Sequence, residues 1–366
     1  MKHTKKSNKK KRNIVFFKKL FIFVTFGLAV QFSVLYYINS FLLVKRDVSK
    51  DMVLKKVVNT ASTNNTDIQI DLPNDIENLQ VSYDSSYISY MDNDNFKVID
   101  TNTGAEKTLD IPRSGHVSCY RWIPNRNKLY IAIKEKLKKS STFTFFSYNA
   151  DNNHMDEVKR DDENIKIVSN TRSEIDDINS SPLTGIVFLK LKNSTSHNSL
   201  YKIDRMNHLY KLDVDNTNIS NISLLLNNDA VVYETLPNHK VYILNKKDTS
   251  RVKIKNSKEL TLINTDKNDT IYLGELSDNK ISTIYYKKLD DINTTDWTEL
   301  KLPHEVNKKD LYLIDKDTIY INDSLKGTLT EINTNKQLTY KGKLLGIYDS
   351  KIVCNVDSKL LKINIK

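Results

Sequence analysis

The strongest constraint on this chain is an apolar–polar alternation with a period of two, which runs through residues 67–366. Helical periodicity is nearly absent from this part. Successive side chains of a β-strand point to opposite faces of a sheet, so the pattern predicts many short strands joined by turns. Clear alternations occur at Leu129/Ile131/Ile133, Val241/Ile243, Leu260/Leu262 and Ile319/Ile321, and turn-forming clusters lie between them at 92–95, 101–104, 227–229 and 333–336.

The strands fall into units of similar length. About 300 residues of such strands exceed one ordinary sandwich, so a repeated architecture is the economical interpretation. We predict an all-β fold, a β-propeller of about seven blades; six or eight blades and a pair of stacked β-sandwiches remain alternatives. The predicted units are 76–112, 115–160, 165–214, 218–255, 258–303 and 308–341, followed by 343–366.

The last unit is one strand short. It offers strands only at 343–348, 351–356 and 359–365, whereas an isolated strand-like segment, 68–72, precedes the first unit. We predict that this segment pairs into the last blade and closes the ring, because closure removes the exposed sheet edges of an open array.

The N-terminal region predicts a membrane anchor. Residues 1–19 form a basic tail, and the 25 residues of 20–44 carry no charge, which suffices for a tilted transmembrane helix. Basic flanks remain cytoplasmic, so residues 67–366 are expected to be extracellular, in a single-pass cell-membrane protein, beyond a flexible linker at 45–66. The alternative, a cleaved signal peptide, has a shorter apolar region and small residues at its cleavage site, whereas residues 40–45 are bulky.

The net charge of +11 is a topology signal. Residues 1–46 hold eleven Lys and Arg and no acidic residue, whereas residues 47–366 hold 45 basic and 45 acidic residues. A neutral domain lacks the basic footprint of a nucleic-acid binder, so no nucleic-acid partner is expected.

Three segments, 83–90, 96–104 and 122–125, resemble the blade of TolB-like and dipeptidyl-peptidase-IV N-terminal propellers. The resemblance covers about residues 76–135. In that family an acidic or Asn turn precedes a strand, and a Trp-x-Pro-Asp/Asn corner opens the next blade. The resemblance therefore implies turn and corner roles for Asp100, Gly104, Trp122, Pro124 and Asn125, with ligand stacking as the alternative for Trp122.

The same resemblance suggests that the protein could be a peptidase, but the sequence does not favour this activity. Such an enzyme needs a hydrolase domain with a G-x-S-x-G-like elbow, and this motif does not occur in the 366 residues. The seven histidines lack metal-ligand spacing, so we expect no metal, cofactor or catalytic residue. We interpret Asp161-Asp162 and Asp176-Asp177 as solvated loop carboxylates. A bridge between Cys119 and Cys354 is left open.

The expected function is that of a non-catalytic, membrane-anchored binding or scaffold module at the cell envelope. Its partner would be an envelope protein, a peptide or a glycan, besides the membrane itself. One alternative is an accessory or sensor subunit of a membrane complex. Another is a surface glycan-acting enzyme, which predicts acidic and aromatic side chains clustered in the central funnel of the ring.

Overall fold

The chain divides into two compact units, Met1–Thr66 and Asp67–Lys366. In the first unit, residues 27–35 are helical. The computed structural model describes Lys19, Thr25 and residues 27–35, 70–73, 76–112, 115–193, 197–214, 218–245, 248–255, 257, 259–292, 296–348 and 350–365.

The transmembrane prediction falls mostly on other residues. Of the predicted span 20–44, only Thr25 and residues 27–35 are described, and the rest of the span and the linker 45–66 lie outside the described residues. Within the described part, no helix has the length and apolar character that crossing a membrane requires.

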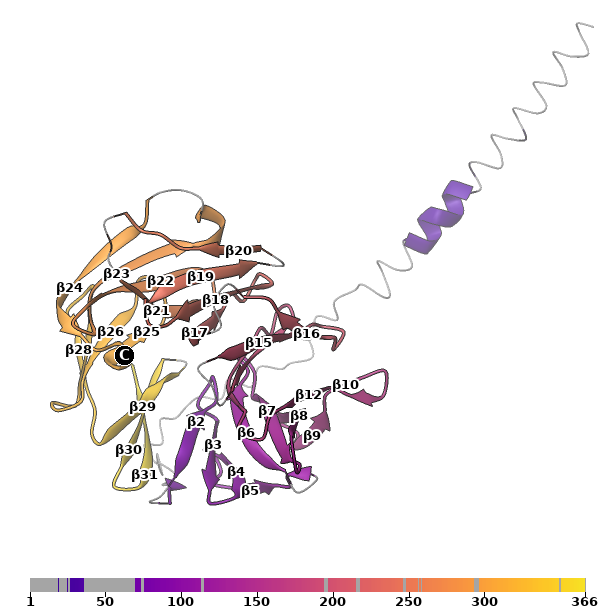
Figure 1. Ribbon diagram of the computed structural model, residues 1–366, viewed down its shortest axis with the longest axis horizontal. Helices are drawn as coiled ribbons and strands as arrows, with labels where there is room; N and C mark the ends of the chain where they lie inside the picture. Colours follow the sequence, from indigo (N-terminus) through magenta and orange to yellow (C-terminus); the bar gives the residue numbers. More distant parts are fainter. Residues whose placement is uncertain are drawn as a thin grey trace, which may run out of the picture. The chain divides into compact units, whose positions relative to one another are not determined.

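The second unit is a seven-bladed β-propeller, as the strand pattern predicts (Figure 1). Each blade is an antiparallel sheet whose first strand lies nearest the ring axis, and the first strands of neighbouring blades pack together. From the axis outward, blade 1 is β2 (Glu77–Val81), β3 (Tyr87–Asp92), β4 (Asn95–Asp100) and β5 (Glu106–Leu109); blade 3 is β13 (Glu174–Ser180), β14 (Val187–Lys192), β15 (Asn198–Ile203) and β16 (Leu209–Leu212).

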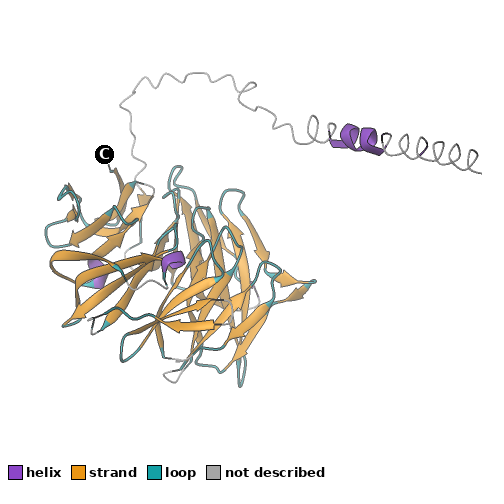
Figure 2. Ribbon diagram, turned by 90° about the horizontal axis from the view of Figure 1, so that it is seen from above, coloured by secondary structure: helices purple, strands orange, loops and turns teal. Residues whose placement is uncertain are grey.

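The next three blades follow the same order. Two short 3-10 helices, η3 (Leu289–Asp291) and η4 (Lys308–Asp310), lie in loops of blade 5 and after it (Figure 2). Blade 4 is β17 (Ile219–Leu224), β18 (Ala230–Thr235), β19 (Lys240–Asn245) and β20 (Asp248–Arg251); blade 5 is β21 (Leu260–Thr265), β22 (Thr270–Ser277), β23 (Lys280–Lys288) and β24 (Thr298–Val306); blade 6 is β25 (Leu311–Leu313), β26 (Ile319–Asp323), β27 (Thr328–Glu331) and β28 (Gln337–Thr339).

Blade 2 departs from the predicted boundaries. Its outer strand is split into β9 (His154–Glu157) and β12 (Lys166–Ser169), which both pair with β8 (Ser141–Asn149). The hairpin β10 (Lys159–Arg160) and β11 (Glu163–Asn164) is inserted between them and projects from the ring edge (Figure 1). The predicted boundary at 160–165 is therefore wrong, because the insertion interrupts a strand that resumes in the same blade. The inner strands of blade 2 are β6 (His116–Trp122) and β7 (Lys128–Lys136).

Blade 7 confirms the predicted ring closure. It consists of β29 (Lys343–Tyr348), β30 (Lys351–Val356) and β31 (Lys359–Asn364), and its fourth strand is β1 (Ile70–Asp71). Ile70 is opposite Leu360, and the Leu72 amide donates to the Ser358 carbonyl oxygen at 2.6 Å. The two ends of the ring are thus joined by main-chain hydrogen bonds.

The hydrophobic core is divided into seven clusters, one between each pair of adjacent blades. A blade is a sheet covered on both faces, so its second strand is apolar on both sides and nearly every residue is buried. At roughly 25 cal/mol per Å² of apolar surface, this face-to-face packing is the main force that holds the ring together.

Candidate functional site

The predicted corner residues lie at the junction of blades 1 and 2. Trp122 ends β6 and is 6% exposed, and its ring stacks on Tyr87 with centroids 6.1 Å apart. Pro124 and Asn125 follow in the exposed β6–β7 turn, where Asn125 adopts a φ of +60°. Asn tolerates this left-handed conformation better than most residues. The structure therefore places Trp122 in a packed core and Asn125 in a tight turn.

Asp100 and Gly104 lie in the turn between β4 and β5. The Asp100 side chain accepts a hydrogen bond from the Asn102 amide at 2.8 Å, and the Gly104 amide donates to the Asp100 carbonyl oxygen at 2.8 Å. Burial, followed by the nearby carboxylates of Asp151 and Asp100, raises the pKa of Tyr87 to about 12. Tyr87 thus links this turn to the ring of Trp122.

Asp176 and Asp177 are not loop residues, which corrects the interpretation from the sequence. They lie in β13, an inner strand, and each has a cationic partner. Lys190 Nζ is 3.4 Å from Asp176 Oδ2, and Arg121 Nη2 is 2.8 Å from Asp177 Oδ1. Asp161 and Asp162, in contrast, form the exposed β10–β11 turn as expected, and both have positive φ.

A third acidic residue of β13, Glu174, pairs with Lys134 of β7 and accepts a hydrogen bond from the Ser118 hydroxyl at 2.8 Å. Lys134 has a side chain only 4% exposed. Three carboxylates on one inner strand are therefore bound to cations of blades 2 and 3. This pattern joins blades together, and it leaves no carboxylate of this strand without a positive partner.

No group of three or more His, Cys, Asp and Glu side chains suited to hold a metal ion occurs among the described residues. Cys119 and Cys354 are both free thiols, so they do not form the bridge that the sequence left open. Burial raises the pKa of Cys119 to about 12 and that of Cys354 to about 11, which keeps both protonated and unreactive at neutral pH.

A groove between blades 2 and 3, the inter-blade groove, has a volume of about 410 Å³. It borders the apolar cluster that joins these blades, with which it shares Tyr130, Val187 and Ile203. Its lining combines side chains of β7, β8 and β9 with the β13–β14 and β15–β16 turns. The lining residues are Ile123, Arg126, Lys128, Tyr130, Ser147, Asp156, Glu157, Val158, Lys159, Ser180, Ser181, Pro182, Gly185, Val187, Ile203 and Asn207.

A row of three polar residues crosses the groove, from Tyr130 and Ser147 on its floor to the exposed Asp156. Tyr130 of β7 is opposite Ser147 of β8, and Ser147 is opposite Asp156 of β9. Directly opposed residues share a sheet face, with Cβ atoms about 5 Å apart. The hydroxyls of Tyr130 and Ser147 are buried and have no hydrogen-bond partner among the described residues. Burial raises the pKa of Tyr130, so its hydroxyl stays protonated and able to donate.

The wall from blade 3 is a compact turn held by Ser181. The Ser181 hydroxyl accepts hydrogen bonds from the amides of Leu183 and Thr184, both at 3.2 Å, and donates to the Leu226 carbonyl oxygen of blade 4 at 2.6 Å. Gly185 has a φ of +70°, a conformation that a residue with a Cβ rarely adopts. The turn therefore keeps a fixed shape beside the groove.

The inserted hairpin contributes Lys159, at its base, to the groove lining. Asn207, in the β15–β16 turn, donates from Nδ2 to the Lys159 carbonyl oxygen at 2.7 Å, which joins blade 3 to the base of the hairpin. Asn207 also lines a second recess of about 520 Å³ beneath β10–β11. Asn207 thus lines both hollows, and residues of the hairpin contribute to each.

Charged groups line the mouth of the groove. Arg126 donates to the Pro182 carbonyl oxygen at 3.0 Å, and Asp156 contacts His154 Nε2 at 2.8 Å. Lys128 and Lys159 have no acidic partner within the described part of the chain. Three cations and two carboxylates line the groove, and one of the carboxylates is already bound to a histidine.

Two large apolar side chains next in the chain to lining residues are exposed to solvent. Leu183 in the β13–β14 turn is 64% exposed, and Met206 in the β15–β16 turn is 70% exposed. Neither side chain lines the groove itself, but their chain neighbours Pro182 and Asn207 do, so both offer apolar surface next to it.

The sequence did not predict the inter-blade groove. The only signal for the inserted hairpin is Asp161-Asp162 between Lys159-Arg160 and Glu163-Asn164, a two-residue turn flanked by polar residues. The groove forms because Tyr130 pairs with Ser147 and because blade 3 packs beside blade 2. Both depend on which strands lie side by side, which the sequence does not show.

No known protein-family model and no curated protein sequence matches the chain. Solved structures share its fold. A prolyl endopeptidase matches with a TM-score of 0.50 and 10% identity, over 73% of this chain and 41% of its own. The WD40 repeats of RRP9 match with a TM-score of 0.49 and 11% identity, and the match covers 79% of this chain and 93% of the RRP9 chain. Dipeptidyl peptidase 4 of Porphyromonas gingivalis matches with a TM-score of 0.47 and 10% identity, and the match covers 78% of this chain and 51% of the peptidase chain. At these identities the likeness concerns the fold alone. The chain shares the propeller fold that its resemblance to dipeptidyl-peptidase-IV N-terminal propellers predicts.

Proposed function

We propose that this protein is a non-catalytic binding or scaffold module, and that it binds a ligand in the inter-blade groove. The observation that carries the proposal is the buried pair of hydroxyls, Tyr130 and Ser147, on the groove floor without a hydrogen-bond partner in the described part of the chain. An unpaired buried hydroxyl costs about 1–3 kcal/mol, which a bound ligand with a complementary group would offset.

The proposal includes a location. The propeller is presented outside the cell on a single-pass membrane anchor at 20–44, with a cytoplasmic N-terminus and an envelope protein or peptide as its partner. This part is supported by the sequence: a basic tail, an uncharged stretch of 25 residues and a neutral domain after it. Protease added to intact cells should cleave the propeller and leave an epitope at the N-terminus protected. Full protection of the propeller would contradict the location.

Site-specific photo-crosslinking tests the binding site. A photoreactive amino acid is placed at Leu183 or Met206, beside the groove, and at Leu325, which is 98% exposed in blade 6. We expect one partner, identified by mass spectrometry, to crosslink at the two groove positions and not at Leu325. Lys128→Glu, in the groove lining, should abolish the adduct. Equal adducts at all three positions would count against a specific site in the groove.

A further inference from the structure

We propose that the inter-blade groove takes the free C-terminal carboxylate of a peptide, and that Lys128, Tyr130 and Ser147 bind this carboxylate. The inference rests on the proposed function, because it names the ligand class of the same groove. A carboxylate accepts several hydrogen bonds and carries one negative charge. The groove must therefore offer donors, an unpaired cation and room for the chain that precedes the carboxylate.

The donors are the two buried hydroxyls. Tyr130 and Ser147 are opposite each other on adjacent strands, so their side chains project from one sheet face toward one volume. Neither hydroxyl has a hydrogen-bond partner among the residues described, although the Tyr130 side chain is only 5% exposed. Hydrogen bonds from neutral donors to a charged acceptor are about twice as strong as bonds between neutral groups. A carboxylate is thus the acceptor that these two hydroxyls would stabilise most.

The unpaired cation is Lys128. It lies two residues before Tyr130 in β7, hence on the same sheet face, and it has no acidic partner in the described part of the chain. The acid of this row, Asp156, already contacts His154. An anionic ligand group at the Lys128 end of the row therefore gains an ion pair, whereas a cationic group there meets repulsion.

The groove rim favours a peptide as the carrier of the carboxylate. Leu183 and Met206 offer aliphatic surface, which suits apolar side chains of the residues before the C-terminus. A sugar ring would instead gain most from a free aromatic face on which to stack. Among the described lining residues, Tyr130 carries the one aromatic ring, and it is 5% exposed and in tilted contact with Phe145 at 6.1 Å between centroids, so little of its face is free for a sugar ring.

The probe is a fluorescent tripeptide, Gly-Leu-Leu, labelled at its N-terminus and made with a free C-terminal acid or a C-terminal amide. Binding to the full-length chain in detergent is measured by fluorescence anisotropy. We expect the acid to bind at least about tenfold more tightly than the amide, the difference that one charge-assisted contact supplies. Equal affinities would overturn the assignment of the carboxylate.

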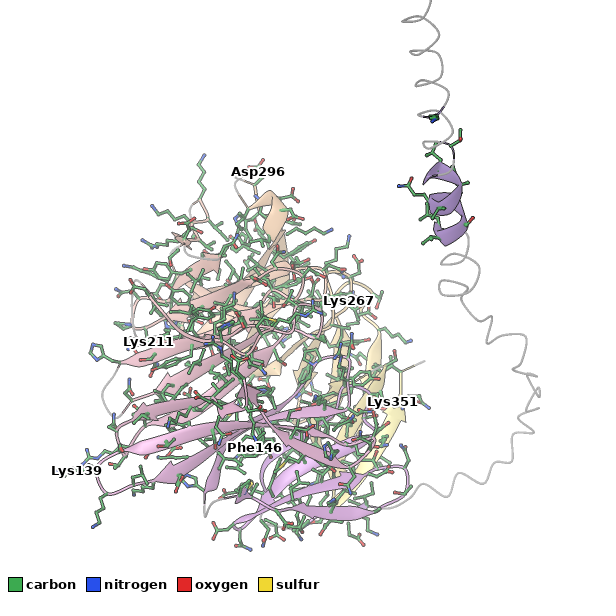
Figure 3. The ribbon with its side chains drawn as sticks, turned by 90° about the vertical axis from the view of Figure 1, so that its right-hand side faces the viewer. Lys139, Phe146, Lys211, Lys267, Asp296 and Lys351 are labelled. Atoms are coloured by element: carbon green, nitrogen blue, oxygen red, sulfur yellow. The ribbon has the colours of Figure 1, made fainter. Side chains whose placement is uncertain are left out.

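Variants separate the groove from other surfaces. Lys128→Met and Tyr130→Phe should each weaken binding of the acid about five- to tenfold and leave the amide unchanged, which also shows that the variants are folded. The matched control is Lys139→Met, because Lys139 is an exposed lysine of the same blade in the β7–β8 turn, and projects into solvent (Figure 3). Equal losses for Lys128→Met and Lys139→Met would overturn the proposed contact.

Competition with glucuronic acid tests whether the bound carboxylate belongs to a peptide or to a sugar. If it displaces the tripeptide acid at an equal concentration, the ligand is a sugar acid and the peptide assignment is wrong. If no probe binds at millimolar concentration while Leu183 and Met206 still crosslink a partner, this inference fails and the proposed function stands. If crosslinking at these positions also fails, the groove is not a binding site and both fail.

Discussion

Tyr130 and Ser147 are opposite each other across β7 and β8, and the structure gives neither buried hydroxyl a hydrogen-bond partner among its described residues. Six other side-chain oxygen or nitrogen atoms of strands and turns share this property, but Tyr130 and Ser147 also line a groove. A pair of unsatisfied groups at the floor of a hollow is a cost to folding that function explains more readily than packing does.

The first prediction concerns that cost. Tyr130→Phe removes a hydroxyl without a partner, so the free energy of unfolding should stay unchanged or rise by about 1 kcal/mol. The matched control is Tyr120→Phe, because the Tyr120 hydroxyl donates to the Asn78 carbonyl oxygen. This control should lose about 1 kcal/mol in urea unfolding. A loss for Tyr130→Phe as large as that for Tyr120→Phe would mean that its hydroxyl is satisfied in the free protein.

The second prediction concerns ring closure. Ile70 is 5% exposed and packs in the cluster between blades 7 and 1. Ile70→Ala should lower the free energy of unfolding by about 2–4 kcal/mol, since it removes buried methyl groups and weakens β1, the strand that closes blade 7. Leu183→Ala, at an exposed site, should change it by less than about 0.5 kcal/mol. Thermal unfolding of both variants measures the difference. Similar small effects in both would show that ring closure by β1 contributes little to the free energy of unfolding.

The third prediction concerns the ion pair between Lys134 and Glu174. Glu174→Gln leaves a lysine that is 4% exposed without its countercharge, and should cost about 3 kcal/mol of stability. Lys134→Met should cost clearly less, because the Glu174 side chain is 43% exposed and water can solvate its carboxylate. Denaturant unfolding of the two variants gives the ranking. The reverse ranking would show that Lys134 is hydrated or finds another partner.

The fourth prediction concerns acid. Burial alone would raise the pKa of Asp84, but hydrogen bonds from the Ser86 amide and from the side chains of Asn127, Ser86 and Ser82 hold it below its ordinary value of 3.8. The carboxylate therefore stabilises the folded state fully above its unfolded pKa, and this contribution disappears as the pH falls through the lower folded pKa. The stability difference between the wild type and Asp84→Asn should shrink between about pH 5 and about pH 2, as measured by thermal unfolding. A constant difference would contradict the assignment.

The fifth prediction separates structure from binding at Trp122. Its ring is buried between blades 1 and 2 and stacks on Tyr87, so Trp122→Ala should cost about 3–5 kcal/mol of stability. Trp122→Phe should recover part of this loss and leave the affinity of the tripeptide acid unchanged. Trp297→Ala, at a half-buried site of blade 5, should cost less. A change of ligand affinity in Trp122→Phe with normal stability would favour a stacking role instead.

The sequence by itself determined the fold class, because alternation and turns are local properties. The runs at 343–348 and 351–356 are strands within these bounds, and the isolated segment 68–72 contains the closing strand β1. Asn93 and Asn335, both at turn positions, have a positive φ, as expected of a residue that tolerates the left-handed conformation. Such features depend on a few neighbouring residues, and a sequence displays them directly.

Only the tertiary structure decided where the blades meet. Lys166–Ser169 returns to blade 2 after an inserted hairpin, and Asp176 and Asp177 sit in an inner strand, since pairing partners far along the chain fix both. The inter-blade groove has the same origin: Tyr130 and Ser147 are 17 positions apart in the sequence, and Asn207 joins them only because blade 3 packs beside blade 2. Sheet pairing and blade packing are non-local, so the alternation of apolar and polar residues specifies the strands and leaves the site to their assembly.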